Sequence, residues 1–188
     1  MMQDFAMHLL DLAHNSISAQ ATRLSVVIHE SPTHDRFKIS LEDDGCGMSE
    51  ETLSKVRSPF YTSRTTRRVG MGIPLLEGTS TQCGGTFTLT SQIVKGTLIG
   101  AEMPYACIDR PPLGDVGSAI AMILQAAPDL KLMLDYTYEN ETFIFGSDEI
   151  RETLGDEVRI DEPDILLFIR DYVQEHIHAL KQGGKSEK

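Results

Sequence analysis

The sequence predicts an α+β fold: a two-layer α/β sandwich in which helices cover one face of a mostly antiparallel sheet, followed by a C-terminal α/β extension. Apolar residues indicate the element order helix, strand, strand, helix, loop, helix, strand, strand over the first hundred residues. The charge then changes, because residues 1–104 hold 11 acids and 9 bases whereas residues 105–188 hold 17 acids and 8 bases. We therefore expect one domain over residues 1–104, an acidic extension over 105–181 and a disordered tail over 182–188.

The first predicted helix covers residues 2–17, where apolar residues recur at helical spacing. Asp11 and Asn15 stand four positions apart in it, so both side chains project from one face, one turn from each other. A carboxylate and an amide oxygen in this arrangement are able to orient a water and hold a hard cation such as Mg²⁺. Taken alone, the segment favours an ordinary solvated helix face.

Two alternating strands, residues 24–29 and 37–43, are predicted to form a hairpin. The second strand ends in an acidic turn with two closely spaced glycines, Gly45 and Gly47, directly after Asp43. The strand would fix the carboxylate, and glycines let backbone approach a flat ligand without interference from Cβ atoms. By itself, an acidic turn of this kind is more often only a turn.

A basic segment follows a short predicted helix that ends near residue 57. No acid occurs between Glu51 and Glu77, and residues 60–69 are rich in hydroxyls and guanidiniums, which indicates a loop with an anionic ligand. Gly70 and Gly72 then open the next helix. Free N–H groups at a helix N-terminus favour an anion, so this junction is a candidate phosphate site; a plain loop-to-helix junction is the alternative.

Later elements complete the sheet and build the extension. Strands are predicted over 86–91 and 97–103. In the extension, the expected helices and strands follow one another over residues 116–127, 130–138, 141–145, 147–154 and 163–180. No nucleophile or metal pattern stands out in this extension, which favours a role in packing or in partner binding.

Taken together, residues 5–104 resemble the GHKL (Bergerat-fold) ATPase superfamily, which includes gyrase, a heat-shock chaperone, histidine kinases and mismatch-repair ATPases. Four motifs carry the resemblance, in the matching order and spacing: residues 11–16, 43–47, 70–73 and 95–97. The resemblance implies that Asn15 holds Mg²⁺ and that Asp43 accepts the exocyclic amine of adenine. Asp11 stands where gyrase-like members have a catalytic Glu. The implied nucleotide-binding residues are Asn15, Asp43, Gly45, Gly47, Met48, Phe60, Arg64, Gly70, Met71, Gly72, Ile73 and Thr97.

Within the superfamily, residues 59–64 and 83–86 look most like the catalytic domain of histidine kinases. Only ten residues precede Asp11, so we expect no upstream phosphoacceptor unit. The favoured interpretation is a stand-alone, ATP-dependent protein kinase or slow ATPase that acts on a separate partner protein, with the acidic extension as a candidate contact. The alternative is a non-catalytic, ATP-gated binding module, which the shorter Asp11 motivates. A dimeric ATPase of the gyrase or chaperone type is a less favoured interpretation than these two, although a homodimer is compatible with the sequence.

Composition excludes several other classes. The net charge of −11 argues against general nucleic-acid binding, and no apolar run is long enough to span a membrane. No signal peptide is predicted, and the three cysteines are widely spaced, which argues against a zinc site or a disulfide framework and fits the cytoplasm. His8 and His14 are weak phosphoacceptor candidates, because a histidine beside a helix face is usually only a polar neighbour.

Overall fold

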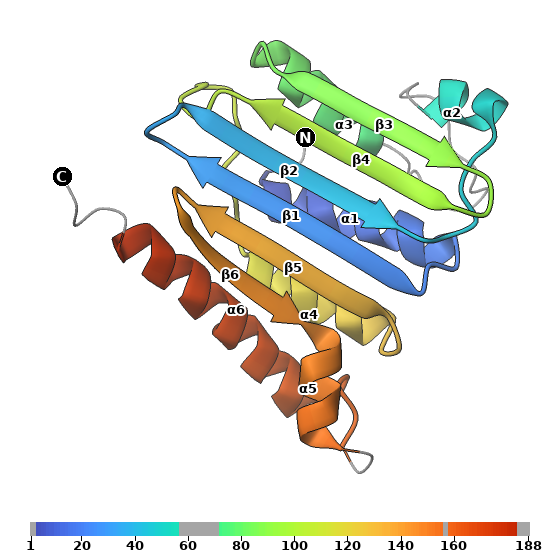
Figure 1. Ribbon diagram of the computed structural model, residues 1–188, viewed down its shortest axis with the longest axis vertical. Coiled ribbons are helices and arrows are strands. Elements are labelled where there is room, and N and C mark those ends of the chain that lie inside the picture. Colours follow the sequence, from blue (N-terminus) through green and yellow to red (C-terminus); the bar gives the residue numbers. More distant parts are fainter. Residues whose placement is uncertain (1–2, 57–71, 156–157, 184–188) are drawn as a thin grey trace.

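The computed structural model describes residues 3–56, 72–155 and 158–183. In these residues six strands form one sheet in the order β3-β4-β2-β1-β5-β6 (Figure 1). The strands are β1 (Arg23–Ser31), β2 (Arg36–Asp43), β3 (Thr86–Gln92), β4 (Gly96–Met103), β5 (Lys131–Tyr138) and β6 (Glu141–Gly146). Neighbouring strands are antiparallel except for β1 and β5, which run parallel.

Helices cover one face of this sheet (Figure 1). The helices of the described residues are α1 (Phe5–Ser18), α2 (Glu50–Val56), α3 (Gly72–Gln82), α4 (Val116–Ala126), α5 (Ser147–Leu154) and α6 (Pro163–Gly183). Of these, α2 and α5 lie near the ends of strands rather than over the face of the sheet (Figure 1). The parallel pairing of β1 with β5 requires a crossover connection, and α4 lies in it. The predicted two-layer α+β fold is therefore confirmed, and the observed elements lie within a few residues of the predicted ones. No helix in the described ranges is both long and apolar enough to cross a membrane.

The sheet's two faces follow directly from the alternation in its sequence. In β1, Leu24, Val26 and Ile28 are almost fully buried under the helices, whereas the residues between them point to the uncovered face. On the helical side, Phe5 of α1 stacks on Phe37 of β2 with ring centroids 4.4 Å apart. Each such side chain contributes about 1.5–3 kcal/mol by leaving water. The helix layer is therefore held to the sheet mainly by apolar burial.

The acidic extension belongs to the same sheet and the same core as the residues before it. Leu24 of β1 pairs with Leu132 of β5, and the hydrophobic cluster continues from α1 through α4 to α6. α4 and α6 approach closely at Gly117, where a Cβ atom would lie 2.2 Å from the Arg170 carbonyl oxygen. Only glycine permits that approach. The extension is therefore packed against the preceding residues through both its sheet and its helices.

One expectation about the cysteines is wrong. Cys83, directly after α3, and Cys107, in the connection after β4, form a disulfide with their Cα atoms 5.7 Å apart. The 24-residue separation hides this proximity in the sequence. The β3–β4 hairpin turns the chain back on itself and brings the two residues together. Cys46 is free and exposed.

Candidate functional site

Asp43 is the last residue of β2, and its side chain faces the helices with only 8% of its surface exposed. One carboxylate oxygen, Oδ2, accepts a hydrogen bond from the Ser16 hydroxyl at 2.6 Å. The other, Oδ1, accepts one from the Gly45 N–H at 2.9 Å. A buried carboxylate held by α1 on one side and by its own turn on the other has a fixed orientation, and its remaining lone pairs can accept from a ligand.

Two polar residues lie beside Asp43 because they share one transverse row of the sheet with it. Asp43 pairs with Thr97 of β4, and Thr97 pairs with Ser91 of β3. The Ser91 hydroxyl donates to the Gly96 carbonyl at 3.0 Å and accepts from the Met48 N–H at 2.8 Å. Since that hydroxyl has one proton, the Thr97 hydroxyl donates to it at 2.9 Å. Ser91 thus joins the predicted residues Met48 and Thr97.

The two glycines of the acidic turn are required because other segments of the chain pack closely against them. Gly47 has a φ of +66°, and a Cβ atom there would lie 2.0 Å from the Gln92 carbonyl oxygen. At Gly45 a Cβ atom would lie 2.9 Å from the Ala19 Cβ atom. The sequence suggested that these glycines make room for a ligand. In the structure they allow the turn to pack between the end of α1 and the β3–β4 hairpin, which places Asp43.

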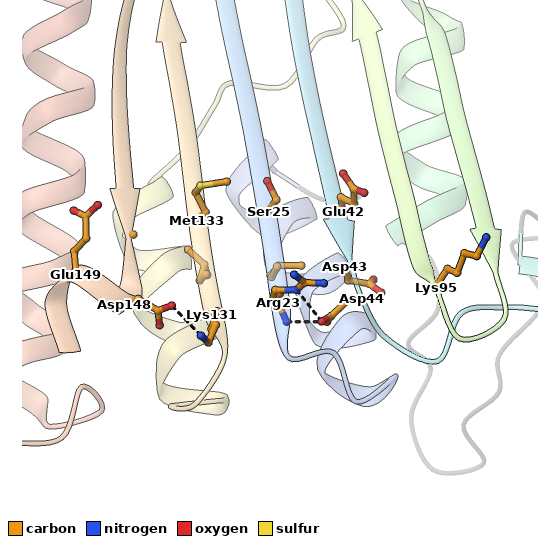
Figure 2. A pocket seen from close by; sticks show the side chains of 13 residues that line it. Arg23, Ser25, Glu42, Asp43, Asp44, Lys95, Lys131, Met133, Asp148 and Glu149 are labelled. Carbon is orange, nitrogen blue, oxygen red and sulfur yellow. Dashed lines mark hydrogen bonds and ion pairs between the residues drawn. The ribbon is translucent and has the colours of Figure 1, made fainter. Parts of the chain in front are cut away.

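Asp44 has a different task from its neighbour. It accepts hydrogen bonds from both the N–H and the hydroxyl of Thr22, each at 2.7 Å, and from the Arg23 N–H at 2.8 Å. Its pairing with the Arg23 guanidinium at 3.1 Å is drawn in Figure 2. Burial alone would raise the pKa of Asp44, but these hydrogen bonds outweigh it and hold the pKa well below its usual value. Asp44 fastens the start of β1 to the end of β2.

A second group of predicted residues lies where α1 meets α3. Asp11 and Asn15 are half-buried on α1, and Gly72 and Ile73 are the first two residues of α3. A Cβ atom on Gly72 would lie 2.3 Å from the Asp11 Oδ2 atom, so only glycine allows this contact. That oxygen is buried and has no hydrogen-bond partner among the residues that the structure describes. Ile73 is buried in the core and fixes the start of α3.

His8 lies one turn before Asp11 and is almost fully buried, with 2% of its surface exposed. Burial lowers the pKa of His8, although the Asp11 and Asp4 carboxylates and a hydrogen bond with the Gly72 backbone oppose this effect. Its imidazole is therefore neutral at pH 7, and its Nδ1 atom has no hydrogen-bond partner within the described part of the chain. Such burial is unfavourable for a phosphoacceptor, which must reach solvent.

α1 connects the two groups. Ser16 contacts Asp43, and Asp11, one turn and a half earlier, contacts the first residue of α3. The structure thus brings together Asp43, Gly45, Gly47, Met48 and Thr97 at one end, and Asp11, Asn15, Gly72 and Ile73 at the other. The remaining predicted residues, Phe60, Arg64, Gly70 and Met71, lie outside the described residues.

Sequence reasoning missed Ser16 and Ser91 as site residues. Ser16 directly follows Asn15, and its place one turn after Leu12 points it toward the sheet, so the helical pattern contained a usable signal. Ser91 alternates with solvent-facing residues in β3, but its partners depend on strand register, which no single segment specifies.

The arrangement fits a nucleotide that carries a hard cation. The fixed Asp43 carboxylate is an acceptor for an amine, and a helix N-terminus such as that of α3 favours phosphates through its N–H groups and the positive end of its dipole. Mg²⁺ binds through one or two protein oxygens together with phosphate and water oxygens. The Asn15 amide oxygen and the unpartnered Asp11 oxygen match that donor set, so the residues present fit Mg²⁺.

Comparison with known proteins gives a family match that includes these residues. Residues 3–106 match the model of the histidine kinase-, DNA gyrase B- and HSP90-like ATPase family. The sensor histidine kinase ZraS of Escherichia coli (strain K12) is 27% identical over 106 residues, which cover 56% of this chain and 23% of that protein. Sporulation kinase C of Bacillus subtilis (strain 168) is 26% identical over 95 residues, which cover 50% of this chain and 22% of that protein.

A solved structure, the N-terminal domain of a DNA repair protein, shares the fold at 16% identity with a TM-score of 0.50, covering 76% of this chain and 52% of that one. The chain spans less than a quarter of the length of the two kinases named above. The family match covers more than half of this chain and includes every predicted site residue. The chain therefore belongs to the histidine kinase-, DNA gyrase B- and HSP90-like ATPase family, and it contains an ATP-binding domain of the histidine-kinase-like type.

Proposed function

We propose that this chain binds Mg-ATP and uses it as a protein kinase or slow ATPase that acts on a separate partner protein. One observation carries the proposal: α1 contacts a fixed, buried carboxylate at one end and the first residue of α3 at the other. An adenine acceptor and a phosphate-binding helix N-terminus are thereby held on one rigid element.

At the base end, the Asp43 carboxylate selects adenine. Its oxygens are occupied on one side by Ser16 and Gly45, and their free lone pairs accept the exocyclic amine. Guanine carries a carbonyl oxygen at the corresponding position, and two acceptors facing each other in a buried site are unfavourable. The neutral Thr97 hydroxyl lies in the same row of the sheet and supports the same end of the nucleotide.

At the phosphate end, Asp11 serves as the base. In hydrolysis, a water oxygen bonds to the γ-phosphorus, the bond to the ADP oxygen breaks, and the water proton passes to the Asp11 carboxylate. In transfer, a nucleophilic side chain of the partner protein replaces the water. Asn15 would hold Mg²⁺, which neutralises phosphate charge when bound. The position of Asp11 Oδ2 supports this role, because it lies against the first residue of α3, where the phosphates are proposed to bind, and it has no hydrogen-bond partner among the described residues.

A second candidate is an ATP-gated binding module without catalysis. The short, half-buried Asp11 side chain, packed against Gly72, favours it. Phosphate release distinguishes the two functions. A steady release rate that disappears in Asp11→Asn, with ATP binding retained, supports catalysis; no release from the wild type above background supports the module. Label transferred from γ-labelled ATP to an added protein separates a kinase from an ATPase.

Calorimetric titration with ATP, with and without Mg²⁺, tests the placement of the nucleotide. Asp43→Asn replaces one acceptor oxygen with a donor, and we expect the Kd to rise by about 10-fold or more, since hydrogen bonds to charged groups contribute about 1.5–3 kcal/mol. Glu42→Gln is the matched control, because Glu42 precedes Asp43 on β2 and faces the opposite side of the sheet. Equal affinity for both variants would show that adenine does not bind at Asp43.

A further inference from the structure

The uncovered face of the sheet has a hollow at the ends of β2, β1, β5 and β6, beside the start of α5 (Figure 2). Its volume is about 540 Å³. One transverse row of the sheet forms its floor: Glu42 pairs with Ser25, Ser25 with Met133, and Met133 with Gly146. The small residues Ser25 and Gly146 flank the larger Met133, so the middle of the row carries the apolar surface.

That apolar surface is open to solvent. Met133 is 50% exposed, and Ile144, in the adjoining row of β6, is 59% exposed. Diagonal neighbours on adjacent strands lie within reach of one another, so the two side chains form one apolar strip. Large apolar side chains that gather on an otherwise polar sheet face are typical of a contact surface.

Some charged side chains around the hollow form ion pairs, which are drawn below the row in Figure 2, whereas the carboxylates at the two ends of the row have no such partner. Arg23 pairs with Asp44 at 3.1 Å, and Lys131 pairs with Asp148 at 3.4 Å. The carboxylates of Glu42, at one end of the row, and of Glu149, at the other, have no hydrogen-bond or ion-pair partner among the described residues.

Glu149 lies over the row's last residue. An ideal Cβ atom on Gly146 would be 3.7 Å from its carboxyl carbon. The two unpaired carboxylates therefore bracket Met133. Lys95 also lines the hollow from the β3–β4 turn, on the side of Glu42 (Figure 2), and has no ion-pair partner in the described ranges.

The spacing of these groups defines what fits. From β2 to β6 there are three strand-to-strand steps, which is about 14 Å. In an extended chain, residues i, i+2 and i+4 project from the same side, and i and i+4 are about 13 Å apart. A cation at each end and an apolar side chain between them would therefore meet Glu42, Met133 and Glu149 in order.

We propose that this hollow binds an extended segment of a partner protein with a lysine or arginine at positions i and i+4 and an apolar residue at i+2. The unpaired carboxylates and the net charge of −11 favour a basic partner. The exposed apolar strip favours a peptide over a simple polyamine, which has no apolar side chain to cover Met133.

The position of the surface also relates it to the nucleotide residues. Glu42 and Asp43 are consecutive in β2, so their side chains point to opposite faces of the sheet. The partner segment would lie on the uncovered face, directly behind the residue proposed to bind adenine. Binding of the segment does not depend on ATP, and it is measured separately from the proposed function.

The test uses the full chain with methyl-labelled methionine and isoleucine and an acetylated seven-residue peptide. The peptide has lysine at its second and sixth positions, leucine at the fourth and threonine elsewhere. We expect the Met133 and Ile144 methyl signals to shift on titration. Glu42→Lys and Glu149→Lys should each weaken binding about threefold, and the pair about tenfold, the range of partly exposed ion pairs. Glu152→Lys is the matched control: Glu152 is exposed on the same helix as Glu149 but does not line the hollow, so its charge reversal should weaken binding much less.

Three results would overturn the proposal. The first is the absence of methyl shifts at peptide concentrations up to the millimolar range. The second is equal binding of a peptide of the same composition with its two lysines adjacent, which would mean general charge attraction. The third is equal binding of spermidine, which would mean that the apolar strip has no part in recognition. Circular dichroism and urea unfolding of each variant establish that it remains folded.

Discussion

The ion pair between Lys181 and Glu30 fastens the last part of α6 to β1, and Lys181→Met should lower the free energy of unfolding substantially. Glu30 is almost fully buried, with 2% of its surface exposed. Its Oε1 atom lies 2.7 Å from the Lys181 Nζ atom and accepts from the Tyr136 hydroxyl at 2.9 Å. Burial, and then the nearby Glu30 charge, raise the pKa of Tyr136, so that hydroxyl remains a donor.

The magnitude follows from what remains after the substitution. Removing one partner of a fully buried ion pair costs about 3–5 kcal/mol, because the other charge is left uncompensated. The Lys181 side chain is 29% exposed, so water replaces part of its interaction with Glu30. We therefore expect a loss of about 2–3 kcal/mol. For a chain of this size that lowers the Tm by about 5–10 °C.

Urea unfolding followed by circular dichroism measures the effect, with an unchanged m-value as evidence that the unfolded state is comparable. Arg36→Met is the control: Arg36 pairs with Glu102 at 2.6 Å on the uncovered face, where both side chains are well exposed, and it should cost less than about 1 kcal/mol. Glu30→Gln in the Lys181→Met background removes the unpaired charge and should restore about half of the loss. If Lys181→Met costs no more than Arg36→Met, the buried Glu30 carboxylate does not need its cation and the reasoning is wrong.

Three further predictions concern the turn, the α1–α3 contact and the disulfide. Because the pKa of Asp44 is depressed in the folded state, its contribution to the free energy of unfolding is present above about pH 4 and is lost as the pH falls further. Asp44→Asn should therefore lower the free energy of unfolding by about 1–2 kcal/mol at pH 7. A pH series of unfolding curves should show the difference between variant and wild type shrinking toward pH 2. Gly72→Ala should displace the Asp11 carboxylate and reduce phosphate release at least tenfold. Gly78→Ala is the control: its new Cβ atom has no neighbour within 4 Å, and it should stabilise α3 by about 0.5–1 kcal/mol. Equal phosphate release from the two variants would contradict a role for the contact between Asp11 and Gly72. Reduction of the disulfide, which closes a loop of 24 residues, should lower the free energy of unfolding by about 3 kcal/mol. Cys46→Ser should unfold with the same free energy as the wild type, both with and without reductant, because Cys46 is not in the disulfide.

The elements were predictable because each depends on local periodicity. β1 and β2 alternate cleanly, and α1 repeats its apolar residues every three or four positions, so their types follow from short segments. The same patterns placed Asp11 and Asn15 on one helix face. They also placed Asp43 at a strand end, where a turn holds a side chain in a fixed orientation.

The contacts that complete the site depend on register and on distant parts of the chain. Ser91 meets Met48 only because β3 pairs with β4 in one register, and a shift by one residue would turn Ser91 to the uncovered face. The cysteine pair is equally non-local, since a hairpin of two strands separates Cys83 from Cys107 in the sequence. Spacing patterns of a few residues carry no information about such pairs.

The pairing of β5 with β1 joins the family domain to the extension. The family match ends at residue 106, yet β5 continues the sheet beyond it and pairs with β1 along eight residues, from Arg23 to Glu30. Without β5, the backbone groups along that edge of β1 would lose their partners, and a long unpaired edge promotes association between chains. The row from Glu42 to Gly146 exists only because this pairing places β5 and β6 beside β1. The proposed partner surface therefore spans the junction between the part that matches the family and the extension that follows it.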